Sequence, residues 1–477
     1  MTRVTGCSDL PRWSRHVGRR KWWLAAIVST VIAAAMPGLA EVTASGATSS
    51  PTSDWLGYHA SPDGSGVALG VHQVVTSRRR WTSPVLDGDL YGEPLVYGHE
   101  VLVATEDDTL YALSTINGHV IWRRHLATPV PSSSLPCGDI SPVVGVTGTP
   151  VIDAVRHEIF LMAFEVDRGV ARHVLYGVGV TTGQVVMRRA VRTPTAAQTA
   201  YLNRSALALD RGSVIYTLGG NYGDCGDYHG VVGALREDGG GREAMFVVDR
   251  APGQREGAIW MGGAAAAVDR AGNVWVASGN GSVTSPGQPY DHSDAVLELS
   301  SAMRLEDFFA PSTWAQDNAN DADLSAQPAL LGNGLVVATG KSGEIYSLRA
   351  AHLGGVGGQL ATVDSGCHDV LDGGSARQGD VVYLPCASGP LAVRVGSAGQ
   401  LRVLWHAASG GGPPIVAARR VWSIDASGVL DGFDAATGAE LQHAPLGSLA
   451  NHFSTPSVGG GLLLAPIARQ VVAFAAH

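Results

Sequence analysis

The loops of this 477-residue chain carry polar side chains at spacings that could hold a metal ion. Asp317, Asp321 and Asp323 share one polar stretch, and carboxylate oxygens so close together in a loop can converge on calcium. The stretch lacks the glycine and the closing glutamate of an EF-hand loop, so we favour a solvated loop or a helix cap. Trp314 precedes these residues in the same loop, and we expect it to be exposed as a contact for a partner.

A second polar segment surrounds Cys225. Asp224, Tyr228 and His229 are candidates for ligand contacts there, because carboxylate, hydroxyl and imidazole groups all bind polar ligands. As a metal ligand or a base, His229 would need a partner that the sequence does not place. We therefore favour a loop that a disulfide pins, with these residues as the candidates if the loop binds a ligand.

The cysteines predict two disulfides. Cys7 lies in an N-terminal segment that we expect to be removed, and an even number of cysteines in an exported chain indicates paired thiols. Three pairings are possible, and the chain order favours Cys137 with Cys225 and Cys367 with Cys386. None of these cysteines lies in a CxxC zinc pattern or a CxxCH haem attachment site.

Residues 1–40 have the pattern of an export signal. Basic residues from Arg12 to Lys21 precede an apolar run from Trp22 to Met36, which predicts cleavage after Ala40 and a secreted or cell-envelope protein. The run is close to the minimal membrane span of about 17 residues, so an uncleaved anchor is one alternative. A twin-arginine signal at Arg19-Arg20 is another. We expect residues 41–70 to be a flexible lead-in and residues 71–477 to form the folded domain.

The charge balance bears on the partners. The whole chain has a net charge of −9, and removal of residues 1–40 takes away six of 33 basic and one of 42 acidic residues, leaving −14. A net acidic surface argues against nucleic acid as a partner. After signal cleavage we expect no membrane span, and we expect a monomer.

The element that must position these loops is a short sheet, best seen at residues 100–122. Alternating apolar residues from Val101 to Val103 and from Leu110 to Leu113 predict two strands around a polar turn. Asn117-Gly118 supplies the positive φ of a tight turn before a third strand that reaches Trp122. Such a sheet cannot bury its own faces, so it requires copies of itself.

Copies of this unit recur with drift along the chain and predict a β-propeller. We expect an all-β fold of eight four-stranded antiparallel blades, or seven if the third copy, near Ser205, is misread. The last copy, from Thr455 to Phe474, has three strands, while a strand around Trp81 precedes the first copy. The strand at Trp81 is therefore expected to complete the last blade and close the ring.

At these residues the chain resembles the quinoprotein alcohol dehydrogenase-like propellers, which carry PQQ-like repeats. LYALSTINGHVIW (Leu110–Trp122) and LDGFDAATGAEL (Leu430–Leu441) are the closest copies of the repeat. Four other segments are similar to an exported actinobacterial group of PQQ-binding-like β-propeller repeat proteins: Gly220–Gly230, Arg255–Trp260, Ala277–Ser282 and Phe308–Leu324. The resemblance is specific for the fold and weak for chemistry.

The resemblance also implies candidate site residues. Family members with dehydrogenase activity hold PQQ and calcium above the axial channel with a Glu, an Asn and a catalytic Asp, and a Lys or Arg lies near the quinone. The matching positions here are Asn280 and Asp291 for calcium, Asp291 also as the catalytic base, and Lys341 for the quinone. Glu165 lies near the place of the calcium glutamate, although its spacing departs from the family pattern.

Other departures weigh against a dehydrogenase. The chain has no adjacent cysteine pair, no fused cytochrome and no Pro-Trp after Asn280. Asn280 between two glycines also fits a left-handed turn, and Lys341 fits a solvated hairpin. We therefore expect an exported, non-catalytic propeller whose loops bind a protein, a glycan or another envelope component. The alternative is a PQQ- and calcium-dependent dehydrogenase of alcohols or sugars, which requires these four residues to converge.

Overall fold

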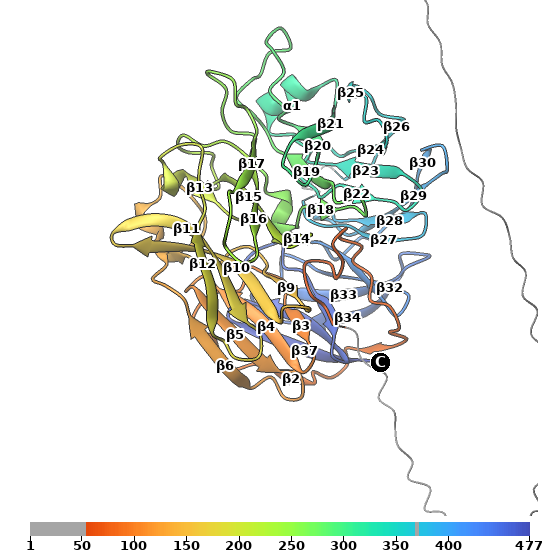
Figure 1. Cartoon of the computed structure of the whole chain (residues 1–477). Helices are drawn as coiled ribbons and strands as arrows, with labels where there is room; N and C mark the ends of the chain where they lie inside the picture. The colour runs from red at the N-terminus through yellow and green to blue at the C-terminus, as the bar shows by residue number, and fades with distance from the viewer. Residues whose placement is uncertain (1–53, 368–371) are drawn as a thin grey trace, which may run out of the picture. The chain divides into compact units, whose positions relative to one another are not determined.

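The alternating apolar residues of each repeat form one antiparallel sheet, and eight such sheets make a β-propeller (Figure 1). The computed structural model describes residues 54–367 and 372–477, which lie in one compact unit, residues 50–477. Eight blades were predicted and are confirmed, so the alternative of seven is excluded. The predicted signal and anchor, residues 1–40, lie outside the described residues.

The strands are short, as expected for half-buried blades of alternating residues. Blades one to four consist of β3 (Leu95–Tyr97), β4 (Glu100–Thr105), β5 (Thr109–Ser114) and β6 (Val120–His125); β9 (Val151–Asp153), β10 (Glu158–Asp167), β11 (Val170–Gly179) and β12 (Val185–Ala190); β13 (Tyr201–Leu202), β14 (Ala208–Asp210), β15 (Ser213–Gly220), β16 (Val231–Arg236) and β17 (Ala244–Val247); and β18 (Ala267–Val268), β19 (Val274–Ser278), β20 (Ala295–Leu299) and β21 (Leu305–Ala310), with β25 (Gly355–Val356) added in parallel.

The second half of the ring repeats the pattern. Blades five to eight consist of β22 (Ala329–Leu330), β23 (Leu335–Thr339), β24 (Glu344–Arg349) and β26 (Ala361–Asp364); β27 (Ala376–Gln378), β28 (Val381–Leu384), β29 (Leu391–Val395) and β30 (Leu401–His406); β31 (Ile415–Ala417), β32 (Arg420–Ile424), β33 (Val429–Asp434) and β34 (Glu440–Pro445); and β35 (Ser457–Gly459), β36 (Leu462–Ile467) and β37 (Gln470–Ala476), which β1 (Val74–Val75) and β2 (Trp81–Thr82) complete.

The ring closes as the sequence predicted. Trp81 of β2 pairs with Ala473 of β37, and Val74 of β1 pairs with Ala476. The outer edge of the last blade is therefore covered by the N-terminal strands, and closure leaves no open edge at the seam.

Tryptophans from one blade dock on the turn of the next blade. Trp81 of β2 covers Gly118 of blade one and donates its indole N–H to Thr115 O at 2.9 Å. Trp122 of β6 covers Gly183 of blade two in the same way. A Cβ at Gly118 would lie 2.5 Å from the indole of Trp81, and one at Gly183 would lie 2.7 Å from that of Trp122. Each of these turns therefore requires glycine for close packing as well as for its positive φ.

The described part of the expected lead-in packs into the ring instead of remaining flexible. Trp55 pairs with Val96 of blade one, and Leu56 O accepts a hydrogen bond from Ile152 N of blade two. Further along, carbonyl groups of the segment accept hydrogen bonds from the inner strands of three more blades: Pro62 O from Val268 N, Ser65 O from Arg377 N, and Gly66 O from Val416 N. Residues 55–68, which we call the axial segment, thus satisfy inner strand edges of blades one, two, four, six and seven. The composition of the segment predicted a flexible lead-in, but its hydrogen bonds to five blades hold it in an ordered position.

One α-helix interrupts the strands in the described part of the chain, besides three single-turn 3-10 helices. α1 (Trp314–Asn320) follows blade four, and its C-cap, Asp321, has a left-handed conformation with φ of 53°. The expectation that Trp314 is exposed was wrong, because its side chain is 5% exposed and lies against Tyr290, with ring centroids 4.9 Å apart. The buried indole of Trp314 thus packs α1 against the rest of the blade. Among the described residues, no helix is both long and apolar enough to span a membrane.

Candidate functional site: a polar cavity at one end of the ring

Loops from one end of the propeller surround a cavity of about 480 Å³. In a four-stranded antiparallel blade, the loops after the second and the fourth strand emerge at the same end. The cavity is built from such loops, and its lining includes the side chains Asp139, Arg204, Tyr222, Asp224, Trp260, Asp321, Ser325, Lys341, Asp372, His452 and Phe453. A smaller adjoining cavity shares Arg204 and Phe453 with it and is also lined by Tyr58 of the axial segment.

Lys341 is one cationic group of the cavity wall. It lies at the β23–β24 turn, and its Nζ is 2.5 Å from Asp321 Oδ1 and 2.9 Å from Asp323 Oδ1. The ammonium also lies 5.9 Å from the centre of the Trp260 ring, within the range of a cation–π contact. Burial alone would lower the pKa of Lys341, but the charges of Asp323, Asp372 and Asp321 outweigh it and raise the pKa above its ordinary value. Lys341 is therefore a fixed cation that already has two carboxylate partners.

Arg204 is the other cationic group. It follows β13, and its guanidinium carbon lies 4.4 Å from the centre of the Phe453 ring. Burial lowers the pKa of Arg204, and the nearby charges of Asp139 and Asp372 oppose this shift. The two cations of the cavity thus each combine an aromatic face with acidic neighbours.

Carboxylates outnumber the cations on the cavity wall. Four aspartates line the cavity, namely Asp139, Asp224, Asp321 and Asp372, against one arginine and one lysine. Asp372 Oδ1 is buried and has no hydrogen-bond partner among the described residues. Burial raises the pKa of Asp372 to about 6, although the charge of Lys341 opposes the shift. At neutral pH the cavity therefore has an acidic excess and at least one acceptor that faces no protein donor.

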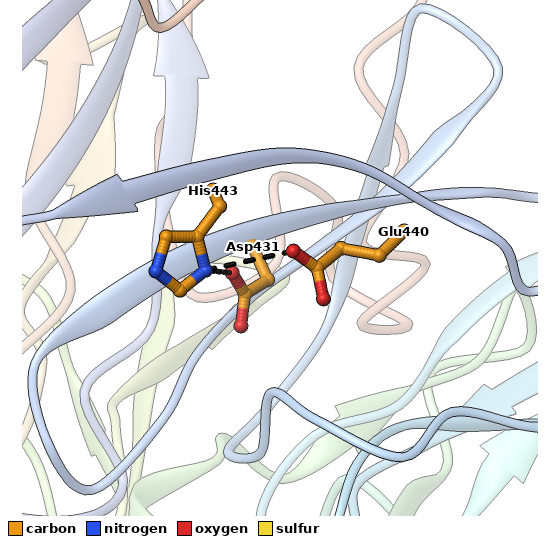
Figure 2. Close-up of side chains that lie close together, drawn as sticks. All are labelled: Asp431, Glu440 and His443. Atoms are coloured by element: carbon orange, nitrogen blue, oxygen red, sulfur yellow. Dashed lines mark hydrogen bonds and ion pairs between the residues drawn. The ribbon is translucent and has the colours of Figure 1, made fainter.

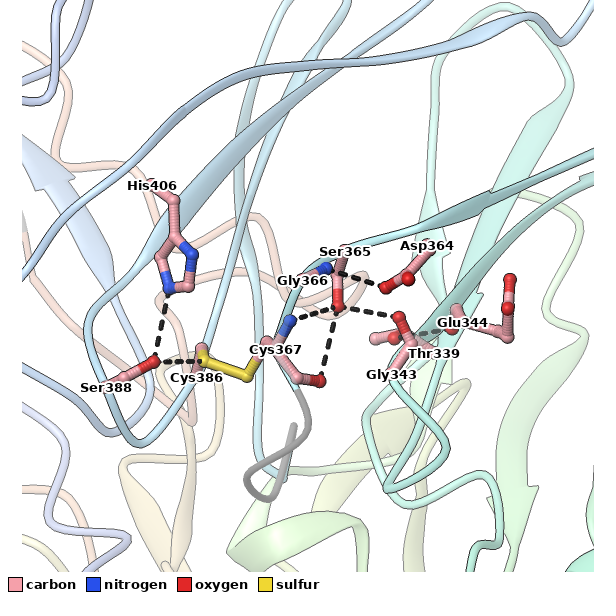
Figure 3. Close-up of a disulfide and its surroundings, with 10 residues drawn as sticks. All are labelled: Thr339, Gly343, Glu344, Asp364, Ser365, Gly366, Cys367, Cys386, Ser388 and His406. Carbon is pink, nitrogen blue, oxygen red and sulfur yellow. Dashed lines mark hydrogen bonds between the residues drawn. A yellow bond between two sulfur atoms is a disulfide. The ribbon is translucent and has the colours of Figure 1, made fainter.

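Both predicted disulfides are confirmed, and both lie beside this cavity. Cys137 pairs with Cys225, which joins the loop of Asp139 to the loop of Tyr222 and Asp224. Cys367, which lies five residues before Asp372, pairs with Cys386 (Figure 3). Two cross-links therefore restrain the loops that shape the cavity wall.

The surroundings of the second disulfide are shown in Figure 3. The hydroxyl of Ser388 lies 3.1 Å from Cys386 Sγ and 3.3 Å from His406 Nε2. On the other side, the hydroxyl of Ser365 donates to Gly343 O, beside Lys341 on the same turn. The disulfide thus joins the segment after β26 to blade six, and Ser365 of that segment holds the β23–β24 turn, which carries Lys341.

Two of the four residues suggested by the resemblance come together. Lys341 Nζ contacts Asp323, and the other oxygen of that carboxylate accepts a hydrogen bond from Asn280 N at 3.3 Å. The side-chain Oδ1 of Asn280 is buried and has no hydrogen-bond partner among the described residues. Lys341 lines the cavity and Asn280 does not.

The other two residues have separate surroundings. Asp291 Oδ1 accepts hydrogen bonds from the backbone N–H and the hydroxyl of Ser293, at 3.1 and 2.5 Å. Asp249 lies near it, and burial followed by the charges of Asp291 and Glu256 raises the pKa of Asp249 to about 9. Glu165 is committed to blade two, where it accepts hydrogen bonds from Tyr176 OH and from Arg188. Neither Asp291 nor Glu165 lines the cavity.

The candidate residues of the binding loops also divide into those that line the cavity and those that do not. Asp224 and Asp321 line the cavity, and Asp323 lies behind it as the buried partner of Lys341. Tyr228 is buried and donates its hydroxyl to Asp224. Asp317 belongs to α1 and accepts a hydrogen bond from Thr313 Oγ1 at 2.6 Å. His229 forms a backbone bridge with Glu256, and its Nδ1 is buried without a partner among the described residues.

Sequence reasoning missed Arg204, Asp372 and Phe453 as wall residues. They come from blades three, six and eight, and neither spacing nor a motif links them.

A closed ring of eight four-stranded blades defines the chain as a β-propeller. The family model of the outer membrane protein assembly factor BamB matches residues 57–275. No curated protein matches the chain.

Several solved structures share the fold. A quinohemoprotein alcohol dehydrogenase from Comamonas testosteroni has a TM-score of 0.66 at 13% identity, over 88% of this chain and 80% of that one. The corresponding enzyme ADHIIG from Pseudomonas putida HK5 has a TM-score of 0.63 at 14% identity, with the same shares covered. BamB from Moraxella catarrhalis has a TM-score of 0.55 at 12% identity, over 84% of this chain and all of that one. At such identities the likeness establishes the fold and not the activity.

Proposed function

We propose that this protein is an extracytoplasmic binding propeller that takes a small hydroxylated ligand, such as a sugar unit of a glycan, into the axial cavity. The observation that carries the proposal is the composition of the cavity wall. Trp260, Tyr222 and Phe453 offer aromatic faces for the apolar side of a sugar ring, and the aspartates and Arg204 offer acceptors and donors for hydroxyl groups. The wall thus combines aromatic faces with polar groups that can fix the orientation of a small ligand.

PQQ does not fit this wall. PQQ is a polycarboxylate, and the cavity presents four aspartates against Arg204 and Lys341. Lys341, the residue that the resemblance assigns to the quinone, already has two carboxylate partners. None of the three residues suggested for calcium (Glu165, Asn280 and Asp291) lines the cavity. We therefore assign no dehydrogenase chemistry to these residues.

Export is part of the proposal. Two disulfides favour an oxidising compartment, and the basic and apolar pattern of residues 1–40 favours a cleaved signal. N-terminal sequencing of the exported protein tests this, with Glu41 as the expected first residue.

Isothermal titration calorimetry of the purified protein against neutral saccharides and against PQQ with calcium tests the ligand. We expect a neutral saccharide to bind and PQQ not to bind. Trp260→Ala should weaken saccharide binding about fivefold or more, because stacking of a ring on an aromatic side chain is worth about 1–3 kcal/mol. Asp238→Asn, on an exposed turn of blade three, is the charge control and should bind as the wild type does. Binding of PQQ and of no saccharide would overturn the proposal.

A protein partner is the second candidate, and the outer strands of blades one and two favour it. Val120 and Ile121 of β6 are 39% and 51% exposed, and Val185 and Val186 of β12 are 42% and 56% exposed. Adjacent exposed β-branched residues on outer strands can pair with a further strand. If this surface binds a protein, Ile121→Lys should abolish binding while saccharide titrations remain unchanged.

A further inference from the structure

A cluster of three metal-ligating side chains lies on blade seven, apart from the axial cavity. Asp431 comes from β33, and Glu440 and His443 come from β34 (Figure 2). One ligand atom from each of the three residues lies within 4.8 Å of the others. His443 Nδ1 is 2.9 Å from Asp431 Oδ1 and 3.5 Å from Glu440 Oε1, and Figure 2 shows the imidazole facing both carboxylates.

A β-bulge brings these three side chains to one face of the sheet. Asp431 pairs directly with His443, so their side chains project from the same face. The register then shifts between Gly432 and Phe433, and Phe433 pairs with Glu440. Without the extra residue, Glu440 and His443 would project from opposite faces, because they are three positions apart on one strand. The bulge therefore re-aims the Glu440 carboxylate toward His443.

The loop that enters blade seven covers the cluster. Ser409 Oγ donates a hydrogen bond to Glu440 Oε2 at 2.8 Å. Gly410, with φ of 85°, passes so close that a Cβ there would lie 3.0 Å from Ser423 Oγ. A side chain at this position would occupy the space between the loop and the cluster.

A second observation points to a ligand here. Ser423 is fully buried, and its hydroxyl has no hydrogen-bond partner among the described residues. It pairs directly with Asp431 across β32 and β33, so its side chain lies on the face of the cluster. A buried hydroxyl normally has a partner, and leaving it without one costs about 1–3 kcal/mol. A bound ion or the water on that ion would supply the partner.

The charges of the cluster also favour a cation. Two carboxylates face one imidazole, and Asp431 is 1% exposed on its side chain. The ligand oxygens of Asp431 and Glu440 lie within 4.8 Å of each other. A divalent ion relieves both the desolvation and the repulsion.

We propose that His443, Asp431 and Glu440 bind one divalent transition-metal ion of the zinc class, with the hydroxyl of Ser423 beside it. A neutral imidazole selects zinc-like ions over calcium and magnesium, which prefer oxygen ligands only. Three protein ligands leave a position for water, and His443 and Glu440 remain 56% and 41% exposed, so solvent reaches that position. The ion cross-links β33 and β34, and the loop from blade six joins it through the hydrogen bond of Ser409 to Glu440.

Titration of the metal-free full protein with Zn²⁺ by isothermal calorimetry tests the site. We expect one strong site, which His443→Ala and Glu440→Gln each weaken at least about tenfold, since even outer residues of metal sites change affinity by about 10–100-fold. The matched control is His352→Ala, because His352 is an exposed histidine beside a single carboxylate, with its Nδ1 3.5 Å from Asp307. This control should keep the affinity of the wild type.

Replacement of Zn²⁺ by Co²⁺ gives a second readout that does not depend on stability. Bound Co²⁺ should show a visible absorption that reports nitrogen and oxygen ligands, and the absorption should be lost in His443→Ala and retained in His352→Ala. Zn²⁺ affinity that is equal in the wild type and in His443→Ala would overturn the proposal. So would the absence of any site in the wild type, and the cluster would then be a hydrogen-bonded network of a protonated histidine.

Discussion

The ammonium of Lys341 lies 2.9 Å from Asp323, a carboxylate that is completely buried behind the wall of the axial cavity. This ion pair joins the β23–β24 turn to the segment after α1, and Lys341 N also donates to Asp323 O at 2.9 Å. The same carboxylate accepts a hydrogen bond from Asn280 N. Three loops of the cavity end are therefore held by one buried charge.

Removal of the lysine should leave that charge without its partner. We expect Lys341→Met to lower the free energy of unfolding by about 3 kcal/mol, because an unpaired buried charge typically costs about 3–5 kcal/mol. Denaturation by urea measures the loss. Arg236→Met is the control, since its pair with Asp238 is exposed and its loss should change the stability little. An equal loss of unfolding free energy in the two variants would show that the burial of Asp323 does not strengthen its pairing with Lys341.

Tryptophan docking can be tested with two glycines. Gly183 and Gly169 both have positive φ, but a Cβ at Gly183 would lie 2.7 Å from Trp122, whereas a Cβ at Gly169 would have no atom within 4 Å. Gly169→Ala should cost only the backbone strain, about 1–2 kcal/mol. Gly183→Ala should cost about 1–3 kcal/mol more, because the indole must move. Thermal unfolding compares the two variants, and equal losses would show that the docking does not stabilise the ring.

The two disulfides should contribute unequally. Cys137 and Cys225 are 88 residues apart, and Cys367 and Cys386 are 19 apart. In the chain-entropy model, a disulfide that closes a longer loop stabilises the folded state more. Replacement of Cys137 and Cys225 by serine should therefore lower the free energy of unfolding by about 1 kcal/mol more than replacement of the other pair. Denaturation of the two double variants measures the difference. A larger loss for the short loop would contradict the model.

The acidic wall should make stability depend on pH. The pKa of Asp372 is raised to about 6 in the folded protein, and an aspartate in the unfolded chain has a pKa of about 4. Between these values the folded state holds a proton that the unfolded state has lost, so stability falls as pH rises from about 4 to about 6. Asp372→Asn should make the unfolding free energy less dependent on pH in this window. Asp238→Asn, at an exposed aspartate, should not, and an unchanged slope in Asp372→Asn would contradict the prediction.

The fold was predictable because its information is local and repeated. Each blade shows alternating residues and a turn glycine, and the incomplete last copy, together with the strand at Trp81, indicated how the ring closes. The disulfide pairs followed from chain order. The axial segment was not predictable, because its composition is that of a linker and its partners lie on five different blades.

The sites were harder to predict, because their residues also come from distant parts of the chain. Lys341 was found through a motif, but Arg204, Asp372 and Phe453 meet it only because the ring brings distant loops to one end. Glu440 and His443 are spaced as if on opposite faces of a strand, and one bulged residue reverses that expectation. Trp314 was placed in solvent because the surrounding residues are polar, whereas a short helix turns it inward.

The axial segment also constrains the order in which this chain can reach its native state. Val67 pairs with Val416, so a piece of chain that is synthesised early acquires this backbone partner only when blade seven exists. Blades can form one after another, but the segment at their centre cannot settle until nearly the whole chain is available. Completion of the propeller is therefore a late, cooperative event, and a chain truncated before blade seven should remain open to proteases at its amino end.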